Sequence, residues 1–331
     1  MSLIYLICRA HGYASRLLKR ELILELASLQ SLQQFVEHLA ATEYGEKLKT
    51  VKTLIELENT IAEVFLDRLR SLLKIAEESG GADFLKTYLE KYDVQNIVWL
   101  LRMKLGKASK EEISSLLIPF REISKIDIEE ILEAEDLAQA LEVIRRSKAY
   151  KLPETVGSLL ELEAELWKSY YMRVFKKISS IPIRDRVEVK RLLGLEVELI
   201  NLRTCILSAV KRLDRGTAEK MFIENPAGTS RRKLRHFLES YDEKFYLEHF
   251  PAYRSYLEKI ISGKEPFAEI ERLRILKKFA EKQRIPKFIS FFYVIKYILD
   301  LEAEYRDLRA ILISIYHGIP NDVRLQLLIN S

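Results

Sequence analysis

The sequence has 331 residues, of which only 11 are Gly and 8 are Pro. Average usage would give roughly 40 of these two residues together, and a chain so poor in them has few tight turns. This excludes sandwich, barrel and propeller folds, which turn back about every 8–12 residues, while an apolar content of 48% excludes disorder. Lys and Arg number 54 against 49 Asp and Glu, and the excess is confined to residues 206–331, which hold 23 basic and 17 acidic residues.

Apolar residues spaced three and four apart predict helices along almost the whole chain, and no alternating run predicts a strand. One clear stripe consists of Leu159, Leu162, Leu166, Tyr170 and Val174. The predicted helices, in chain order, are 15–28, 31–41, 46–77, 93–105, 110–117, 136–146, 153–178 with Pro153 near its first turn, 184–210, 230–239, 252–262 and 286–316. The predicted loops are 79–81, 147–153 and 225–228.

A pattern recurs three times along the chain. An acidic residue is followed, three positions later, by Asn96, Asn201 or Asp307, then by an aliphatic residue and further apolar positions. The two spacings are 105 and 106 residues, which predicts three related helical units. Such a polar side chain beside an apolar stripe makes a buried hydrogen bond or faces solvent, and both interpretations are open. The apolar pattern is expected to end near the following glycines: Gly106, Gly216 and Gly318.

This period replaces the two domains that length alone suggests. We predict an all-α protein with three helical repeats, at residues 1–116, 117–222 and 223–331. A free-standing helical solenoid is an alternative, but the usual solenoid periods of roughly 33–47 residues are far shorter.

No catalytic, cofactor-binding or metal-binding motif is recognisable. The sequence lacks phosphate-binding and dinucleotide-binding glycine patterns, zinc-ligand spacings and a nucleophile elbow. We therefore predict no catalytic residues, no cofactor and no metal. The histidines are expected to be solvated or capping, and they are His11, His38, His236, His249 and His317. Cys205 lies on an apolar stripe and is expected to pack as a small hydrophobic residue.

A basic cluster at residues 231–236 offers the strongest candidate for partner contact. Arg231, Arg232 and Lys233 could meet phosphates of a nucleic acid, or they could simply form the solvated face of a helix. A second basic face at residues 272–284 is diluted by acidic residues, and no aromatic nucleic-acid signature accompanies either. The aromatic residues between 288 and 297 are expected to lie in the core.

Membrane and compartment signals are weak. The apolar start of the chain is interrupted by Arg9 and His11, so we do not predict a signal peptide. The apolar run 288–295 is far shorter than the roughly 20 residues of a membrane span. Two cysteines, Cys8 and Cys205, make no disulfide framework and favour a reducing compartment.

Taken together, segments along nearly the whole chain resemble the C subunit of archaeal and bacterial V/A-type ATP synthases, which is related to the d subunit of eukaryotic vacuolar ATPases. These segments are Arg16–Leu18, Thr42–Gly45, Tyr92–Ile97, Glu198 with Asn201–Thr204, Glu302 with Glu304, and His317–Pro320. The specificity lies in their order and spacing, because no one of them is diagnostic by itself.

The resemblance implies a funnel of three similar helical domains with pseudo-threefold symmetry. It implies a non-catalytic coupling subunit, peripheral to the cytoplasmic side of the membrane, that links the proteolipid ring to the tip of the central rotor shaft, with no nucleic acid or small-molecule substrate. We expect a salt-sensitive shaft contact through charged helix faces. We also expect Arg231, Arg232 and Lys233 to face acidic partner surfaces or lipid headgroups. A helical scaffold or a nucleic-acid-binding protein is the alternative.

Overall fold

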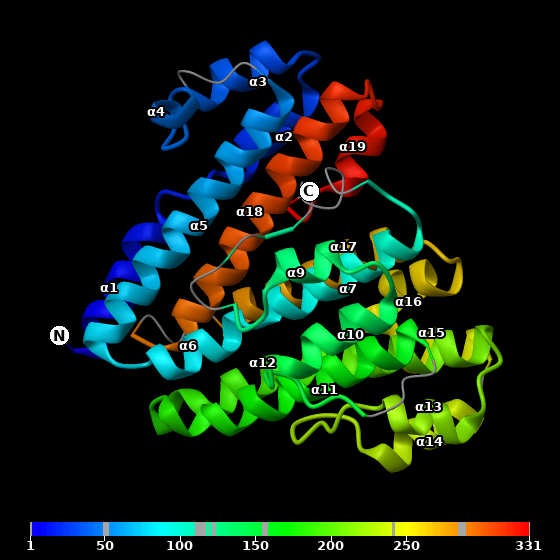
Figure 1. Cartoon of the computed structure of the whole chain (residues 1–331). Helices are drawn as coiled ribbons and strands as arrows, with labels where there is room; N and C mark the ends of the chain where they lie inside the picture. The colour runs from blue at the N-terminus through cyan, green and yellow to red at the C-terminus, as the bar shows by residue number, and fades with distance from the viewer. Residues whose placement is uncertain are drawn as a thin grey trace. The chain divides into compact units, whose positions relative to one another are not determined.

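The computed structural model describes residues 2–48, 53–109, 117–118, 120, 124–153, 158–239, 242–283 and 289–330. Within these ranges every regular element is a helix, which confirms the all-α fold class (Figure 1). None of the helices described there combines the length and the apolar character needed to cross a bilayer. Two compact units make up the chain: residues 1–80 together with 252–331, and residues 81–251.

The first unit is assembled from the two ends of the chain. Its centre consists of α1 (Leu3–Ala14), α5 (Leu54–Ser79) and α18 (Phe292–Tyr316), which pack against one another side by side (Figure 1). The other helices of this unit are α2 (Arg20–Ser28), α3 (Leu32–Leu39), α4 (Gly45–Leu48), α16 (Arg254–Ile261), α17 (Glu265–Lys282) and α19 (Asn321–Leu327). Of these, α17 packs on α16 and α18, and α19 packs on α2 and α18.

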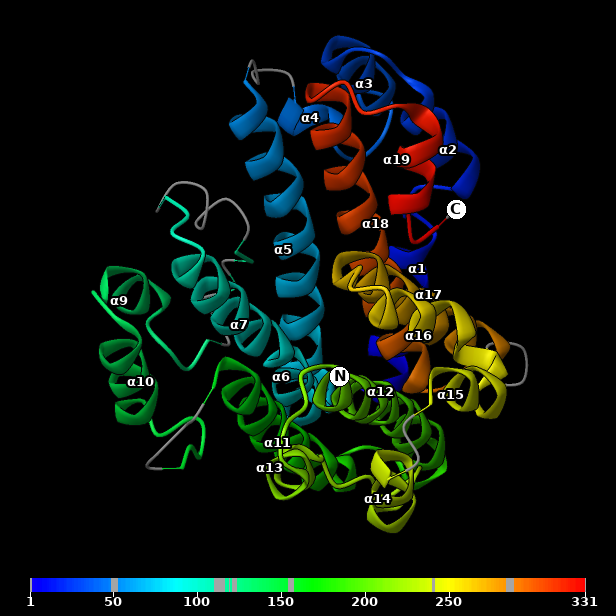
Figure 2. The same cartoon turned by 90° about the vertical axis from the view of Figure 1, so that its right-hand side faces the viewer.

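The second unit is continuous in sequence. Its central helix, α11 (Leu159–Lys177), packs against α6 (Ala82–Leu89), α7 (Lys91–Leu105) and α12 (Ile183–Val210), and Figure 2 shows the last of these near the middle of the view. The shorter helices are α9 (Ile128–Glu133), α10 (Leu137–Arg146), α13 (Arg215–Met221), α14 (Arg231–Glu239) and α15 (Glu243–His249). Both α13 and α14 pack on α12.

The helix boundaries repeat with the period read from the sequence. The first residues of α5, α11 and α17 are spaced by 105 and 106 residues, and so are the last residues of α7, α12 and α18. The first residues of α3, α10 and α15 have the same two spacings. Three segments of the chain therefore share one local plan. The repeat boundaries at 116/117 and 222/223 stay a prediction, because the compact units group the helices by contact rather than by repeat.

Three predicted helix starts were wrong, and capping explains two of them. The helix predicted from residue 15 begins at Arg20, where no side chain caps it. The helix predicted from residue 46 begins at Leu54, where Thr53 and Glu56 form a capping box. The helix predicted from Pro153 begins at Leu159, because the Ser158 side chain accepts from the backbone N–H of Glu161. Residues 110–116 and 284–288, on which one predicted helix and another predicted start fall, lie outside the described residues.

Two of the three glycines predicted to end the long helices lie at helix ends. Gly106 is the C-cap of α7 and Gly318 follows the C-cap of α18, whereas Gly216 lies inside α13. Positive φ angles of 59°, 52° and 64° occur at Lys107, Arg212 and Gly318, spaced by 105 and 106 residues. Each is spanned by a backbone hydrogen bond of the Schellman type, which closes six residues. At two of the three helix ends, a basic residue therefore adopts the left-handed conformation.

The core contains the aromatic cluster that the sequence placed there. Phe291, Phe292 and Tyr297 are buried, whereas Phe288 lies outside the described residues. Cys205 is fully buried as well, and burial raises the pKa of its thiol to about 12. These observations confirm the predicted packing roles of Phe291, Phe292, Tyr297 and Cys205, whereas Tyr293 is only half-buried.

Candidate functional site

The recurring Asn side chains clamp the backbone of a segment 22 residues later. The Asn96 amide donates to the Ile118 carbonyl at 2.7 Å, and its oxygen accepts from the Ile118 N–H at 2.9 Å. Asn201 makes the same pair of bonds to Ile223, at 2.8 and 2.9 Å. Both amides are buried, so the buried hydrogen bond is confirmed over solvent exposure. Each clamp fixes the chain where it leaves one predicted repeat and enters the next.

A carboxylate replaces the amide in the third clamp. Asp307 accepts from the backbone N–H groups of Ile329 and Asn330, at 2.6 and 3.0 Å, and from the Asn330 side chain at 2.7 Å. The register of 22 residues is kept, but every partner is now a donor. Burial raises the pKa of Asp307 to about 6, despite these hydrogen bonds and the nearby Lys277 ammonium.

The acidic residue three positions before each clamp accepts a hydrogen bond from a backbone N–H group in a linker. Asp93 accepts from the Lys125 N–H at 2.9 Å, and burial raises the pKa of Asp93 to about 6. Glu198 is hydrogen-bonded by Thr229 through both backbone and side chain, and burial raises its pKa as well. Glu304 accepts from the Leu18 N–H. The acidic position in the motif therefore anchors the linker that precedes α9, α14 or α2.

A buried ion pair joins α5 to α18 in the first unit. Arg68 donates to Glu304 at 2.5 Å, and the two side chains are only 9% and 3% exposed. The Tyr44 hydroxyl donates to the same carboxylate at 2.8 Å, and Arg68 also reaches Glu43 at 3.0 Å. Burial alone would lower the pKa of Arg68, but the Glu304 charge outweighs it and the pKa is raised. Arg68 is therefore charged, and its charge is compensated inside the protein.

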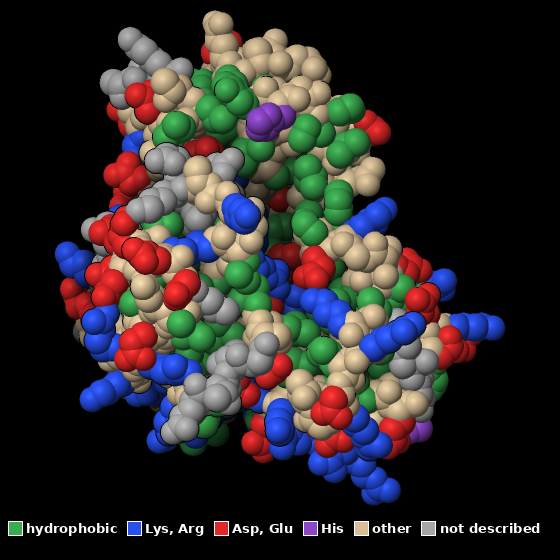
Figure 3. Space-filling view, turned by 45° about the vertical axis from the view of Figure 1, so that its right-hand side comes forward, with side chains coloured by type: hydrophobic (Ala, Val, Ile, Leu, Met, Phe, Trp, Pro, Cys, Tyr) green, Lys and Arg blue, Asp and Glu red, His purple; other side chains and the backbone are tan. Residues whose placement is uncertain are grey.

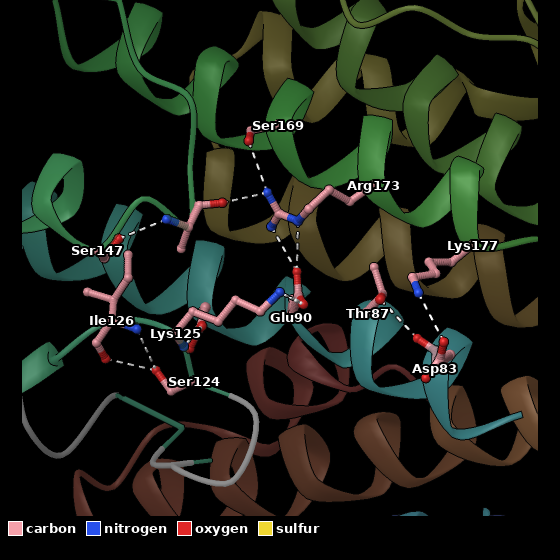
Figure 4. Close-up of polar contacts among 12 residues, drawn as sticks. Asp83, Thr87, Glu90, Ser124, Lys125, Ile126, Ser147, Ser169, Arg173 and Lys177 are labelled. Carbon is pink, nitrogen blue, oxygen red and sulfur yellow. Dashed lines mark hydrogen bonds and ion pairs between the residues drawn. The ribbon is translucent and has the colours of Figure 1, made fainter.

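A second, partly buried ion pair joins α11 to the junction of α6 and α7, with Arg173 23% and Glu90 4% exposed. Arg173 donates to Glu90 through two nitrogens, at 3.0 and 2.8 Å, and Lys125 pairs with the same carboxylate. The remaining guanidinium nitrogen donates to the Ala149 carbonyl at 2.8 Å and to Ser169 at 3.0 Å. Figure 4 shows Arg173 and Lys125 converging on Glu90 from separate elements, with Ser169 on the other side of the Arg173 guanidinium. The network thus ties two helices and two linkers together in the second unit.

The two arginines occupy the same position in their repeats. Arg68 and Arg173 are 105 residues apart, and each guanidinium lies over a buried tyrosine ring: Tyr44 at 5.4 Å and Tyr150 at 4.8 Å from the ring centroid. The tyrosines are 106 residues apart. Sequence reasoning included Tyr44 only within the segment Thr42–Gly45 and missed the other three residues, although a search at the period of the Asn/Asp motif would have found them. Through its carboxylate partner, Arg68 holds α5 against α18 of the third predicted repeat, and Arg173 holds α11 against the α6–α7 junction of the first.

A further pair of equivalent carboxylates braces the starts of α5 and α11. Glu58 and Glu163 are 105 residues apart. Glu58 accepts from Arg309 at 3.1 Å, and Glu163 accepts from Arg203 at 3.3 Å and from Arg102 at 2.6 Å. The long helices are therefore cross-linked near their ends as well as near their middles, which makes each packed unit stiff.

The predicted partner-contact residues are surface residues of α14. Arg231, Arg232 and Lys233 are exposed, whereas the next basic residue, Arg235, is held by Glu219 at 2.8 Å. Figure 3 shows Lys and Arg side chains exposed beside Asp and Glu side chains along the lower edge of that view. Whether a partner covers this cluster stays a prediction.

The contacts of three of the histidines and a search for metal ligands do not add another candidate functional site among the described residues. His11 stacks on Tyr293 with the ring centroids 3.5 Å apart, and His38 and His249 each contact a backbone carbonyl of their own helix. Within the described part of the chain, no group of three His, Cys, Asp or Glu side chains is placed to hold a metal ion. The candidate functional features are therefore the clamps, the two ion pairs and the basic surface.

Comparison with known proteins gives a family. The family model described as ATP synthase (C/AC39) subunit matches residues 6–326. The C subunit of the A-type ATP synthase of Pyrococcus abyssi is 24% identical over 326 residues, covering 94% of this chain and 86% of that protein. The proteins of the same name from Archaeoglobus fulgidus and Thermococcus kodakarensis are 24% and 26% identical, covering 96% and 95% of this chain and 93% and 87% of their own lengths. With a match across almost its whole length, the chain belongs to the ATP synthase (C/AC39) subunit family.

Proposed function

We propose that this protein is a non-catalytic coupling subunit of a rotary ATP synthase. In this proposal three helical repeats form a funnel that receives the tip of the central rotor shaft and rests on the membrane proteolipid ring, peripheral to the cytoplasmic side of the membrane. The observation that carries the proposal is the family match over residues 6–326. It is supported by relatives named as C subunits of A-type ATP synthases, which align along more than nine-tenths of the chain.

The internal bracing supports a mechanical role. A part that transmits torque must deform little, and close-packed helical interiors are stiff and poorly compressible. The Arg68–Glu304 pair ties α5 to α18 near mid-length, and the Arg173–Glu90 pair ties α11 to the junction of α6 and α7. The clamps hold the linkers that follow their helices. The Arg68–Glu304 pair is buried and the Glu90 carboxylate is only 4% exposed, so solvent screening weakens these pairs less than it weakens exposed pairs.

A reconstituted complex tests the proposal. Complexes assembled without this chain are expected to hydrolyse ATP without driving ion transport into proteoliposomes, and adding the full chain back is expected to restore transport. The matched measurement is ATP hydrolysis in the same samples, which separates loss of coupling from loss of the catalytic head. Ion transport that is equally fast without the chain would contradict the proposed role, as would failure of the chain to bind both shaft and ring subunits in detergent.

A further inference from the structure

The backbone passes between the two compact units at two places. The first unit comprises residues 1–80 and 252–331, so the crossings fall at residues 80/81 and 251/252. One crossing lies in the two-residue break between α5 and α6, and the other lies in the four-residue break between α15 and α16. Because each unit is braced internally, any movement of one unit relative to the other must be absorbed in these two short segments.

The first crossing consists of two adjacent glycines with positive φ angles, 94° at Gly80 and 89° at Gly81. Gly80 combines its φ with a ψ of 159°, a region that is essentially restricted to glycine. A Cβ at Gly80 would have no atom within 4 Å, so the backbone conformation, and not close packing, requires glycine here. Since glycine exchanges between backbone regions at low cost, this segment can change its dihedral angles without disturbing neighbouring side chains.

The helices on either side of the two glycines are held firmly in different units. Ala76, in the last turn of α5, is fully buried in the first unit, whereas Phe84 and Leu85, in the first turn of α6, are fully buried in the second. Gly81 is the N-cap of α6 and has no side chain to bond the first turn. The well-packed parts therefore end within a few residues of the crossing, which is typical of a hinge.

The second crossing is a short exposed segment between two anchored aromatic residues. Phe250 packs on Phe237 within the second unit, with the ring centroids 5.1 Å apart. Tyr256, on the other side of the crossing, is only 1% exposed within the first unit. Pro251 and Ala252 lie between these anchors and are exposed. This segment, like the glycine pair, can change conformation without unpacking either unit.

The repeated arginine is missing where it would tie the two units together. The Arg68 and Arg173 ion pairs each lie within one unit, and each ties its repeat to the preceding one in cyclic order. The third repeat keeps the buried tyrosine as Tyr256, 106 residues after Tyr150, but has Phe279 at the position 106 residues after Arg173. By the same plan, position 279 would tie the third repeat to the second, and a phenylalanine cannot form an ion pair.

We propose that the two crossings form a hinge about which the two braced units rotate, with Gly80 and Gly81 as the main pivot. Hinges are a few residues at the ends of elements that absorb changes in φ and ψ while the packed parts move as bodies. A partner that binds both units would then select one angle from those that the free chain samples. The inference concerns the free chain and goes beyond the proposed function without depending on it.

Distances between pairs of spin labels on the full chain test the hinge. In a Cys8→Ser background, Cys205 stays unlabelled because it is buried. Lys278→Cys and Glu142→Cys place labels on different units, and Glu142→Cys with Lys190→Cys places both labels on the second unit, all at exposed positions. Double electron–electron resonance should give a distance distribution at least about twice as wide for the between-unit pair as for the within-unit pair.

A glycine substitution tests the pivot itself. Gly80→Ala should shift the mean between-unit distance by more than about 2 Å and leave the within-unit distance unchanged, because alanine disfavours the positive φ and moves the backbone to another region. Gly263→Ala is the matched control. Gly263 also has a positive φ, of 70°, and open space around its missing Cβ, but it lies inside the first unit. This variant should keep the wild-type between-unit distance.

Each result supports or overturns the hinge. Equally narrow distributions for the two label pairs would overturn it, and so would equal between-unit distances in Gly80→Ala and Gly263→Ala. If Gly80→Ala does not fold, the comparison of widths still decides, because it is made with both glycines in place. A chain with one narrow between-unit distance that restores ATP-driven transport would overturn the hinge and leave the proposed function standing, whereas a broad distribution without restored transport would do the reverse.

Discussion

The two compact units solve the same packing problem with different carboxylates. In the first unit Arg68 pairs with Glu304, which lies within the unbroken helix α18 three residues before the clamp. In the second unit Arg173 pairs with Glu90, which lies at the break between α6 and α7. The two arginines occupy equivalent positions in their repeats, whereas the two glutamates do not. A buried cation must be compensated, but any helix turn that brings a carboxylate within reach can do it.

The surroundings of the two pairs differ as well. Glu304 is shared by Arg68, Tyr44 and the Leu18 N–H, and of these only Arg68 is a cation. Glu90 is shared by two cations, Arg173 and Lys125. Glu304 therefore depends on one cation, whereas Glu90 has a second cation in Lys125. This contrast orders the expected effects of mutation.

The largest effect is expected from Glu304→Ala. The change leaves Arg68 buried without its main counter-charge and removes the acceptor of the Tyr44 hydroxyl and the Leu18 N–H. Breaking a buried pair in this way costs about 3–5 kcal/mol in the free energy of unfolding, measured by urea denaturation. As a matched control, Glu258→Ala breaks the exposed pair with Arg254 and should cost less than about 1 kcal/mol. Similar losses in the two variants would contradict the dependence on one pair.

A smaller loss is expected from Arg173→Ala. Glu90 would remain buried but would keep Lys125 as counter-charge, so we expect about 2–3 kcal/mol. The same denaturation measurement applies. Removing Lys125 as well, in Arg173→Ala/Lys125→Ala, should cost more than the two single changes added together. If Arg173→Ala costs as much as Glu304→Ala, Lys125 provides no reserve and the contrast between the units is wrong.

The smallest effect is a change of pH dependence in Asp307→Asn. Because the folded state raises the pKa of Asp307 to about 6, the fold favours the protonated carboxyl. The stability from this group is present below its unfolded pKa of about 4 and is lost as pH rises through 6. Asn carries no charge, so the variant should lose this dependence and gain about 1–2 kcal/mol at neutral pH relative to acid. Unfolding free energies between pH 4 and 7 measure the difference.

The equivalent clamp of the second unit provides the reverse test. Asn201→Asp places a carboxylate where one partner, the Ile223 carbonyl, is an acceptor. We expect this variant to be destabilised at neutral pH and to acquire the pH dependence that Asp307→Asn loses. Parallel pH profiles for wild type and Asp307→Asn would show that the charge at this clamp has no energetic consequence.

Local patterns were predictable and long-range partners were not. Periodicity located α12 within one residue of its observed start, because an amphipathic stripe is a local property of the chain. The start of α11 was missed by six residues, since Ser158 as a cap outweighs the weak preference for Pro153 near a first turn. The helix α1 was not predicted at all, because its first turns are apolar on most sides and show little periodicity.

The candidate site was predictable to the same limited extent. The motif located Asn96, Asn201 and Asp307, but nothing in it indicated that their partners lie 22 residues further on. The pairing of Arg68 with Glu304 spans 236 residues, and no local pattern encodes such a contact. Periodicity of single residue types could have found Arg68 and Arg173, but only packing identifies their carboxylates.

The division of the chain also sets an order of events during synthesis. Residues 81–251 can complete their contacts while the rest of the chain is still being translated, because this unit is continuous. In contrast, α1 and α5 must wait for α18, more than two hundred residues later, to cover their apolar faces. The Leu18 linker and the Ile329 clamp reach α18 from opposite ends of the chain. We therefore expect the second unit to fold before synthesis ends, and the two terminal segments of the first unit to pack together only after release. Until then the N-terminal helices expose apolar faces that chaperones would have to shield.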